Sequence, residues 1–172
     1  MIQKLNIKDF DRLYEIMEMS FPMDEYRSYQ DQKALLRESS YYIYVVYDEE
    51  SEIKAFMAIW DFDKFVFIEH FAVNPAYRNN GVGEAMLREM VRMLGKTVCL
   101  EVEPPDTDIA SRRIGFYKRN NFVLNNYPYI QPALGEGRSE IPLIIMTSPS
   151  EVDEETFEEI KENLYRRVYK IG

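Results

Sequence analysis

The sequence predicts an α/β protein in which helices flank a mixed β-sheet. In its first half, three strand-type runs follow one another across short turns, which is the pattern of an antiparallel meander. In its second half, strand-type and helix-type segments alternate, as in β-α-β units. The third run, 65–73, is apolar on both faces except for Glu69 and His70, so it belongs in the middle of the sheet.

The N-terminal segment favours a short strand followed by a helix. Residues 1–5 alternate polar and apolar side chains, and Asn6 or Asp9 can cap a helix that runs to Ser20. The apolar stripe of this helix consists of Phe10, Leu13, Ile16 and Met17. A second helix is predicted over 28–38.

The remaining elements follow from periodicity and turn residues. The strands of the meander are predicted at 41–47, 53–61 and 65–73. After them come a helix, a strand, a second helix, two strands and an amphipathic closing helix, at 83–94, 97–102, 109–120, 122–124, 141–146 and 151–169. Each of the helices carries an apolar side that is expected to pack on the sheet.

Length and composition indicate one globular, cytoplasmic domain, 1–172, without a linker. The net charge of -9 disfavours nucleic acid as a partner and is compatible with a cationic substrate, although solubility alone also explains it. No apolar run approaches the roughly 20 residues of a membrane helix, and the start of the chain has no signal-peptide pattern. The single cysteine, Cys99, excludes an internal disulfide and is expected to be a buried thiol. No residue is assigned to a metal site.

A phosphate-binding turn is predicted where the third strand leads through a polar loop to Gly81 and Gly83 at the entry to a helix. The first amides of a helix have no intrahelical partner, and the helix dipole places partial positive charge there. Glycine permits positive φ and a close approach of the backbone to a ligand. Together these features favour an anion, but they are equally typical of a loop that only turns the chain.

Two other phosphate motifs can be compared with this turn. A Walker loop requires Gly-Lys-Ser/Thr, which is absent here. A dinucleotide fingerprint requires glycines directly after the strand and a third small residue, whereas here 74–80 intervene and the third position is Met86. Glu101 and Glu103 lie at a suitable distance along the chain for a ribose partner, so a nicotinamide-dinucleotide-binding enzyme stays an alternative.

The segment 78–83, Arg-x-x-Gly-x-Gly between a strand and a helix, resembles the acetyl-CoA-binding motif of the GNAT superfamily of N-acetyltransferases. A second segment, Phe-Tyr-Lys-Arg-Asn-Asn-Phe at 116–122, resembles a helix end in that family. The runs 67–73 and 100–102 resemble its fourth and fifth strands. The resemblance covers 66–122, about a third of the chain.

Three positions depart from the family pattern. Asn79 stands where many members have glycine, and Asn121 stands where the family has glycine before the final phenylalanine. After glycine, asparagine is the residue best suited to the left-handed conformation that ends a helix. Ala110 stands where many members have an asparagine that contacts the cofactor.

The resemblance implies a GNAT-like mixed, mostly antiparallel central sheet, splayed between its fourth and fifth strands and flanked by helices. In the family the pantetheine arm of acetyl-CoA pairs with the free edge of the fourth strand, which is assigned here to Phe71, Ala72 and Val73. The pyrophosphate rests on the turn that follows, which consists of Arg78, Asn79, Asn80, Gly81, Val82, Gly83 and Glu84. Additional positive charge, or only a solvated helix face, comes from Arg112, Arg113, Lys118 and Arg119.

The resemblance also implies transfer of the acetyl group to a primary amine by direct attack. Tyr117 matches the general acid of the family, and a tyrosine suits the protonation of a leaving thiolate. Two carboxylates are candidates for the general base. Glu69 lies in an otherwise apolar strand, and Glu101 matches the position that other members use. A water relay without a single base is a third possibility.

Strand periodicity predicts which sheet face these side chains share. With a period of two, Glu69 is expected on the face that also carries Phe67, Phe71 and Val73. His70 is then expected on the opposite face, as a histidine of the core or of the sheet edge.

The acceptor is expected to be an amine of a small molecule or a peptide N-terminus. Its contacts are expected from 21–29 and from 127–137, whose aromatic residues could instead form a homodimer contact or ordinary packing. An acetyl-CoA-binding sensor or partner subunit without turnover is an alternative, which the Ala110 position favours and the retained Tyr117 disfavours.

Overall fold

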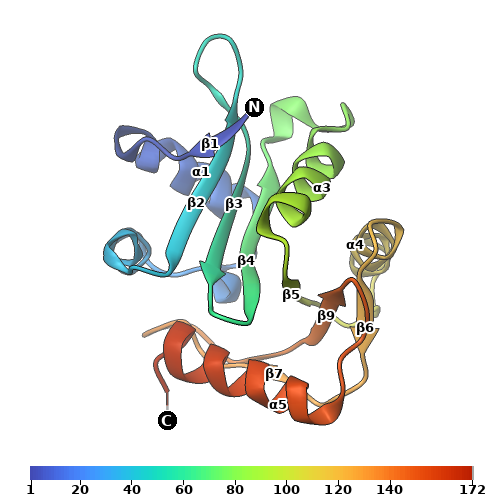
Figure 1. The fold of residues 1–172 in the computed structure, drawn as a ribbon. Helices are drawn as coiled ribbons and strands as arrows, with labels where there is room; N and C mark the ends of the chain where they lie inside the picture. Colours follow the sequence, from blue (N-terminus) through green and yellow to red (C-terminus); the bar gives the residue numbers. More distant parts are fainter. Residues whose placement is uncertain (172) are drawn as a thin grey trace.

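A seven-stranded mixed sheet forms the centre of the structure, a computed structural model that describes residues 1–171 (Figure 1). The strand order is β1-β2-β3-β4-β5-β9-β6, and β7 pairs with β8 in a separate two-stranded sheet. β4 and β5 run parallel, and the other pairs run antiparallel. The strands are β1 Ile2–Lys4, β2 Tyr41–Tyr47, β3 Ile53–Asp61, β4 Phe65–Val73, β5 Thr97–Val102, β6 Val123–Asn125, β7 Ile130–Gln131, β8 Ile141–Pro142 and β9 Ile144–Ser148.

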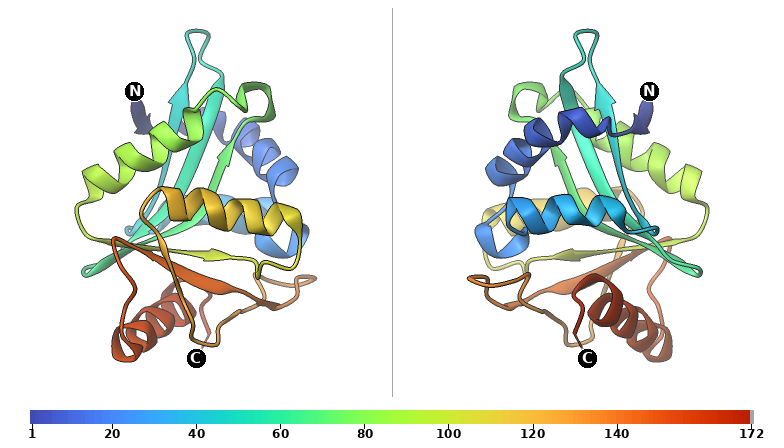
Figure 2. Two further views of the ribbon diagram at one scale, coloured as in Figure 1. Left: turned by 90° about the vertical axis from the view of Figure 1, so that its right-hand side faces the viewer. Right: turned by 90° about the vertical axis from the view of Figure 1, so that its left-hand side faces the viewer.

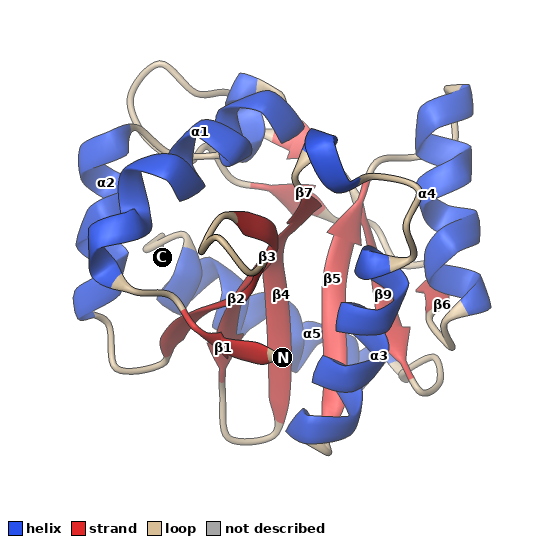
Figure 3. Ribbon diagram, turned by 90° about the horizontal axis from the view of Figure 1, so that it is seen from above, coloured by secondary structure: helices blue, strands red, loops and turns tan. Residues whose placement is uncertain are grey.

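Helices cover both faces of this sheet (Figures 2 and 3). α3 and α4 lie on the face turned to the viewer in the left view of Figure 2, and α1 and α2 lie on the opposite face. α5 closes the lower end of the molecule in Figure 1. The helices are α1 Phe10–Ser20, α2 Tyr29–Ala34, α3 Val82–Leu94, α4 Asp108–Arg119 and α5 Glu154–Asn163.

Each face of the sheet has its own apolar core. The core under α1 and α5 includes Phe10, Trp60, Phe67 and Phe157, all at most 1% exposed. The core under α3 and α4 includes Met57, Val66, Leu87 and Phe122, all at most 2% exposed. β4 contributes to both cores along its length, which confirms that 65–73 is a central strand buried on two faces.

The pairing between β4 and β5 stops halfway along both strands. The register begins at Phe65 with Thr97 and ends at Ile68 with Leu100. β4 continues to Val73, and β5 continues to Val102, without further pairing between them. The sheet is therefore splayed at this point, and the expected mixed, mostly antiparallel sheet flanked by helices is confirmed.

A β-bulge in β4 corrects the faces predicted for its polar residues. Ala58 faces His70 while the next residue of β3, Ile59, faces Ile68, so Glu69 is the extra residue. Because the extra residue resets the alternation, Glu69 and His70 both point to the α1 side of the sheet. The prediction that they occupy opposite faces is wrong.

The same bulge separates Glu69 from the residues expected to share its face. Phe67 lies in the core on the α1 side, like Glu69, but Phe71 and Val73 pack in the core under α3 and α4. An isolated sequence gives no periodic signal for a bulge, because an apolar strand reads the same in either alternation.

The predicted N-terminal elements are confirmed with small shifts of their ends. Asn6 caps a 3-10 turn that leads into α1, and the predicted apolar stripe of α1 is buried. The helix predicted at 28–38 is α2 followed by a 3-10 turn, Leu35–Arg37. Asn121 adopts φ 68° after α4, as expected for a left-handed helix end.

The C-terminal third differs more from the prediction. The strand predicted at 141–146 is divided into β8 and β9, and the two-residue strand β7 was not predicted, because two residues carry no periodicity. The closing helix predicted at 151–169 is α5, which begins at Glu154 and continues as a π-helix, Leu164–Val168.

Candidate active site

A cavity of about 660 Å³ lies where β4 and β5 diverge. The unpaired halves of both strands form its centre, and residues of the α3 N-terminus, of α4 and of the segment after α1 close it. The three predicted catalytic residues line this cavity, and so do all the predicted cofactor-binding residues except Asn80. Of the four basic residues of α4 considered in addition, Arg112 and Arg113 line it, and Lys118 and Arg119 do not. The splay therefore brings together residues of the predicted phosphate-binding turn and the three candidate catalytic side chains.

The turn before α3 has the backbone conformation that an anion site requires. Asn79 has φ 69° and Gly81 has φ 73°. Gly81 is the N-cap of α3 and provides no side-chain hydrogen bond to the helix, so the first amides of α3 are available to a ligand. The two positive φ values explain why asparagine and glycine occupy these positions.

Gly83 has a packing role in addition to its place in the turn. A Cβ at this position would lie 3.0 Å from Cγ2 of Val73. The absence of a side chain therefore lets α3 approach β4 closely. Substitution of Gly83 would disturb this contact as well as a bound anion.

Basic side chains also belong to the lining of the cavity. Arg78, Arg112 and Arg113 line it and are exposed. Within residues 1–171 none of the three forms an ion pair. Their charge is therefore free to attract an anionic ligand. Ala110, by contrast, lies on the buried side of α4 and does not line the cavity.

Tyr117 lies on α4 with its ring in an aromatic cluster. The ring packs edge-on against Phe116 and Phe122, at centroid distances of 5.3 and 5.6 Å. Burial raises the pKa of the Tyr117 hydroxyl to about 12. The hydroxyl is therefore protonated at neutral pH, as a proton donor must be.

Glu69 is engaged in a buried ion pair. One carboxylate oxygen lies 2.7 Å from Nη1 of Arg27, and the other accepts a hydrogen bond of 2.8 Å from Nε1 of Trp60. Although burial opposes ionisation, Arg27 and these hydrogen bonds hold the pKa of the Glu69 carboxyl below its usual value. A carboxylate held in this way is a weak base.

Glu101 has a different environment although it is equally buried. Burial raises the pKa of the Glu101 carboxyl to about 7, and hydrogen bonds from the hydroxyls of Tyr129 and Tyr169 limit this rise. A carboxyl with a pKa near neutrality can gain and lose a proton at working pH. The two candidate bases therefore differ in pKa because their surroundings differ, and the pKa of Glu101 suits a general base better.

The cavity also holds a second pair of carboxyls, which the sequence does not predict. Glu25 and Glu103 both line it and lie against one another. Burial raises the pKa of the Glu25 carboxyl to about 8, and the Glu103 carboxyl beside it adds to the rise. Glu25 lies in a polar stretch of ordinary composition, so no pattern in the sequence marks it.

The two predicted acceptor segments contribute unequally. Phe21 and Glu25 of the first segment line the cavity, as does Gln131 of the second. Tyr127 instead packs on Phe157. His70 also lines the cavity, with Nε2 2.6 Å from the backbone oxygen of Glu25, and burial lowers the pKa of its imidazole.

Other sequence predictions concern residues outside the cavity. Cys99 is fully buried, as predicted. Among the residues that the structure describes, His, Cys, Asp and Glu form no group of three or more that could hold a metal ion. In the same residues, no helix has both the length and the apolar character needed to cross a membrane.

Comparison with known proteins identifies the family. Residues 39–124 match the model of the acetyltransferase (GNAT) domain. The predicted acetyltransferase YjbC of Bacillus subtilis (strain 168) is 26% identical over 159 residues, which cover 91% of this chain and 80% of YjbC. The structure of a predicted GNAT-family acetyltransferase from Bacteroides thetaiotaomicron is 33% identical, with a TM-score of 0.88 over 100% of this chain and 99% of the other.

The chain therefore belongs to the GNAT family of acetyltransferases, and the prediction of a GNAT-type N-acetyltransferase is confirmed. The ribosomal-protein-S18-alanine N-acetyltransferase from Escherichia coli has the same fold. It is 22% identical, with a TM-score of 0.67 over 90% of this chain and 96% of the other. The family assignment leaves the nicotinamide-dinucleotide alternative without support.

The buried ion pair gives a prediction for stability. Arg27→Met is expected to lower the free energy of unfolding at pH 7 by about 3–5 kcal/mol, because it leaves the Glu69 carboxylate buried and unpaired. In the native protein the pKa of Glu69 is lowered, so its stabilising contribution is present above the unfolded pKa of about 4.3 and is lost as the pH falls. In the variant that pKa is raised, so the loss of stability should shrink as the pH falls from 7 to 5.

Urea unfolding followed by circular dichroism at both pH values measures this difference. The double variant Arg27→Met/Glu69→Gln is the control, and it should recover much of the lost stability because the unpaired charge is gone. A loss that is equal at pH 5 and pH 7 would show that packing, and not charge, accounts for it.

Proposed function

We propose that this protein transfers an acetyl group from acetyl-CoA to a primary amine, and that residues 1–172 act as one domain. The observation that carries the proposal is the set of charged groups that line one cavity. The first amides of α3 and the exposed arginines suit an anionic donor, and Glu25, Glu101 and Glu103 suit a cationic acceptor. Tyr117 lines the same cavity.

The residues present fit acetyl-CoA. The free half of β4, Phe71 to Val73, offers a strand edge to an extended amide-bearing ligand. The turn from Arg78 to Glu84 offers backbone amides and a helix N-terminus to a pyrophosphate. When bound, acetyl-CoA supplies a thioester whose acyl carbon is open to attack by an amine.

In this proposal Glu101 is the general base. An alkyl ammonium ion titrates near pH 10 and must lose a proton before its nitrogen can attack. The Glu101 carboxylate accepts that proton, directly or through one water molecule. Glu69 has no such role, because its carboxylate is bound to Arg27 and Trp60.

Tyr117 is the general acid in the same proposal. Its hydroxyl gives a proton to the sulfur as the bond from sulfur to the acyl carbon breaks. The acceptor nitrogen loses two protons overall: the first goes to Glu101 and from there to solvent, and the second leaves the tetrahedral adduct and replaces the proton that Tyr117 gives to the thiolate. A backbone amide of β4, which we assign to Phe71, stabilises the negative charge that develops on the acyl oxygen.

The acceptor in this proposal approaches as a cation. Burial and the neighbouring Glu103 carboxyl keep a proton on Glu25 at neutral pH, and a cation placed beside the pair would favour the ionised form of Glu25. The ammonium group of a small polyamine or of a peptide N-terminus is such a cation. The fold relative from E. coli is named for an alanine N-terminus of a ribosomal protein, which makes a peptide amine a reasonable member of any acceptor panel.

Calorimetric titration tests the donor. Acetyl-CoA and CoA are expected to bind the native protein with micromolar affinity, because the turn and the strand edge are preformed. NADH is expected not to bind. Saturable binding of NADH without binding of acetyl-CoA would overturn the proposal.

Replacement of Tyr117 by Phe tests turnover. The variant is expected to lose about 100-fold or more in kcat while its affinity for acetyl-CoA is kept, because only the proton donor is removed. Tyr127→Phe is a matched control, since the Tyr127 hydroxyl donates to the backbone oxygen of Val152. Native turnover in Tyr117→Phe would remove this residue from the mechanism, and native protein that binds acetyl-CoA without turning over any amine would favour a sensor.

An amine panel tests whether the carboxyls that line the cavity bind the acceptor. Thiol release is measured with n-butylamine, 1,4-diaminobutane, spermidine and a hexapeptide that begins with alanine. For the accepted cations, Glu103→Gln is expected to raise KM about fivefold to tenfold with little change in the Kd of acetyl-CoA, because a single charge contact is lost. Asp106→Asn, an exposed acid of the same loop outside the cavity, should leave KM unchanged. If KM is the same in Glu103→Gln and Asp106→Asn, Glu103 does not contribute to acceptor binding.

A further inference from the structure

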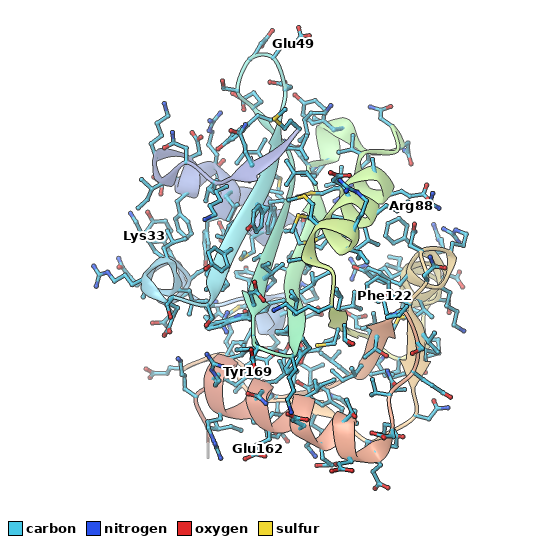
Figure 4. The ribbon with its side chains drawn as sticks, viewed as in Figure 1. Lys33, Glu49, Arg88, Phe122, Glu162 and Tyr169 are labelled. Atoms are coloured by element: carbon cyan, nitrogen blue, oxygen red, sulfur yellow. The ribbon has the colours of Figure 1, made fainter. Side chains whose placement is uncertain are left out.

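The C-terminal turn of the chain reaches the underside of the cavity. After α5 the backbone widens into the π-helix Leu164–Val168, and the amide of Tyr169 donates to the carbonyl of Leu164 at 3.0 Å. π-helical turns are rare and are frequent at functional sites. This turn brings Tyr169 beneath the sheet, where it is only 7% exposed, and Figure 4 labels it between the C-terminal helix and the strands.

Tyr169 and Tyr129 both direct their hydroxyls to Glu101. The Tyr169 oxygen lies 2.7 and 2.9 Å from the two carboxylate oxygens, and the Tyr129 hydroxyl donates to one of them. Each hydroxyl has one hydrogen to donate, and within the described residues neither donates to another acceptor. Both donations are satisfied together when Glu101 is ionised, because a protonated carboxyl must donate a hydrogen itself.

The same turn also holds the ion pair on the other side of the splay. The carbonyl of Val168 accepts a hydrogen bond of 3.4 Å from Nη2 of Arg27, whose Nη1 pairs with Glu69. Two consecutive residues, Val168 and Tyr169, therefore contact Arg27, the ion-pair partner of Glu69 in β4, and Glu101 in β5. This turn therefore links β4, through Arg27 and Glu69, with β5, through Glu101, just beyond the point where the two strands stop pairing.

We propose that Tyr169 is a positioning residue of the acyl-transfer reaction, whose hydroxyl, together with that of Tyr129, keeps the Glu101 carboxylate ionised and turned toward the cavity. This inference rests on the proposed role of Glu101 as the base. Tyr169 does not touch the reacting atoms in this proposal, and it acts through Glu101. The residue also gives the π-turn a function, because a regular helix would direct this side chain differently.

Several other ionisable groups near Glu101 also influence its pKa, so a test of one hydrogen bond must leave their charges unchanged. Glu69 and Arg27 act from the α1 side and oppose one another, and Glu25 faces Glu101 from the segment after α1. The groups on the remaining elements around Glu101 are Cys99, Tyr129, Tyr165 and Tyr169. Replacement of a tyrosine by phenylalanine changes none of these charges at neutral pH, so it isolates the hydrogen bond.

The direction of the expected effect follows from the hydrogen bond. A donor to a carboxylate stabilises the ionised form, so its removal raises the pKa of the acid. In Tyr169→Phe the pKa of Glu101 should move upward by about one unit. The acidic limb of the pH profile of kcat/KM should move with it, which lowers kcat/KM about tenfold at pH 6 and restores it at pH 9.

The test uses the full chain labelled with ¹³C at the glutamate carboxyl carbons. The Glu101 resonance is the one that is missing from Glu101→Gln, and its titration is followed by NMR in the native protein, in Tyr169→Phe and in Tyr165→Phe. Tyr165 comes from the same turn but donates its hydroxyl to the backbone oxygen of Ile130, so Tyr165→Phe should titrate as the native protein does. Kinetic profiles are recorded in parallel with the amine of the panel that is acetylated fastest.

The test distinguishes a failure of this inference from a failure of the proposed function on which it rests. A Glu101 titration and an acidic limb that are unchanged in Tyr169→Phe would overturn the positioning role. So would a rate that falls equally at every pH, since that would reflect a structural defect alone. If Glu101→Gln retains native turnover, the proposed base is wrong, whereas the loss of turnover in Glu101→Gln with a native profile in Tyr169→Phe leaves the base in place and rejects only Tyr169.

Discussion

The end of backbone pairing between β4 and β5, at Ile68 and Leu100, is the constraint on which the rest of the site depends. Parallel strands that separate leave amides and carbonyls without partners, and buried backbone groups need partners. In this protein α3 packs against β4, and α4 packs against β5, beside the gap. The cavity, its free strand edge and the helix N-terminus beside it all follow from that separation.

Much of the fold could be predicted from the sequence because local patterns agree with the final structure. The bounds 53–61 and 65–73 match β3 and β4, since long apolar runs between turn residues specify strands. The bulge at Glu69 could not be predicted, because it depends on the register with β3. Two-residue strands such as β7 and the π-turn after α5 were missed for a similar reason: tertiary packing, and not periodicity, determines them.

The candidate site shows the same limit more sharply. Glu69 and Glu101 are both single carboxylates in apolar strands, and the sequence offers no means to rank them. What distinguishes them is the partner that each meets: Arg27 comes from 42 residues before Glu69, and Tyr169 comes from 68 residues after Glu101. A neighbouring cation lowers the pKa of the Glu69 carboxyl, whereas burial beside two neutral hydrogen-bond donors leaves the pKa of the Glu101 carboxyl at about 7. The chemistry of each residue is therefore a property of the tertiary structure.

The contact between Arg27 and the carbonyl of Val168 spans 141 positions of the chain. Contacts of such long sequence separation form late in folding, because closing a large loop costs entropy before the contact is made. During synthesis on a ribosome, β1 to β5 emerge well before the turn that carries Tyr169. The strands β1 to β5 and the turn before α3 can then assemble while Glu101 still lacks one of its two hydrogen-bond donors, so the proposed base is among the last groups of the site to reach its final environment.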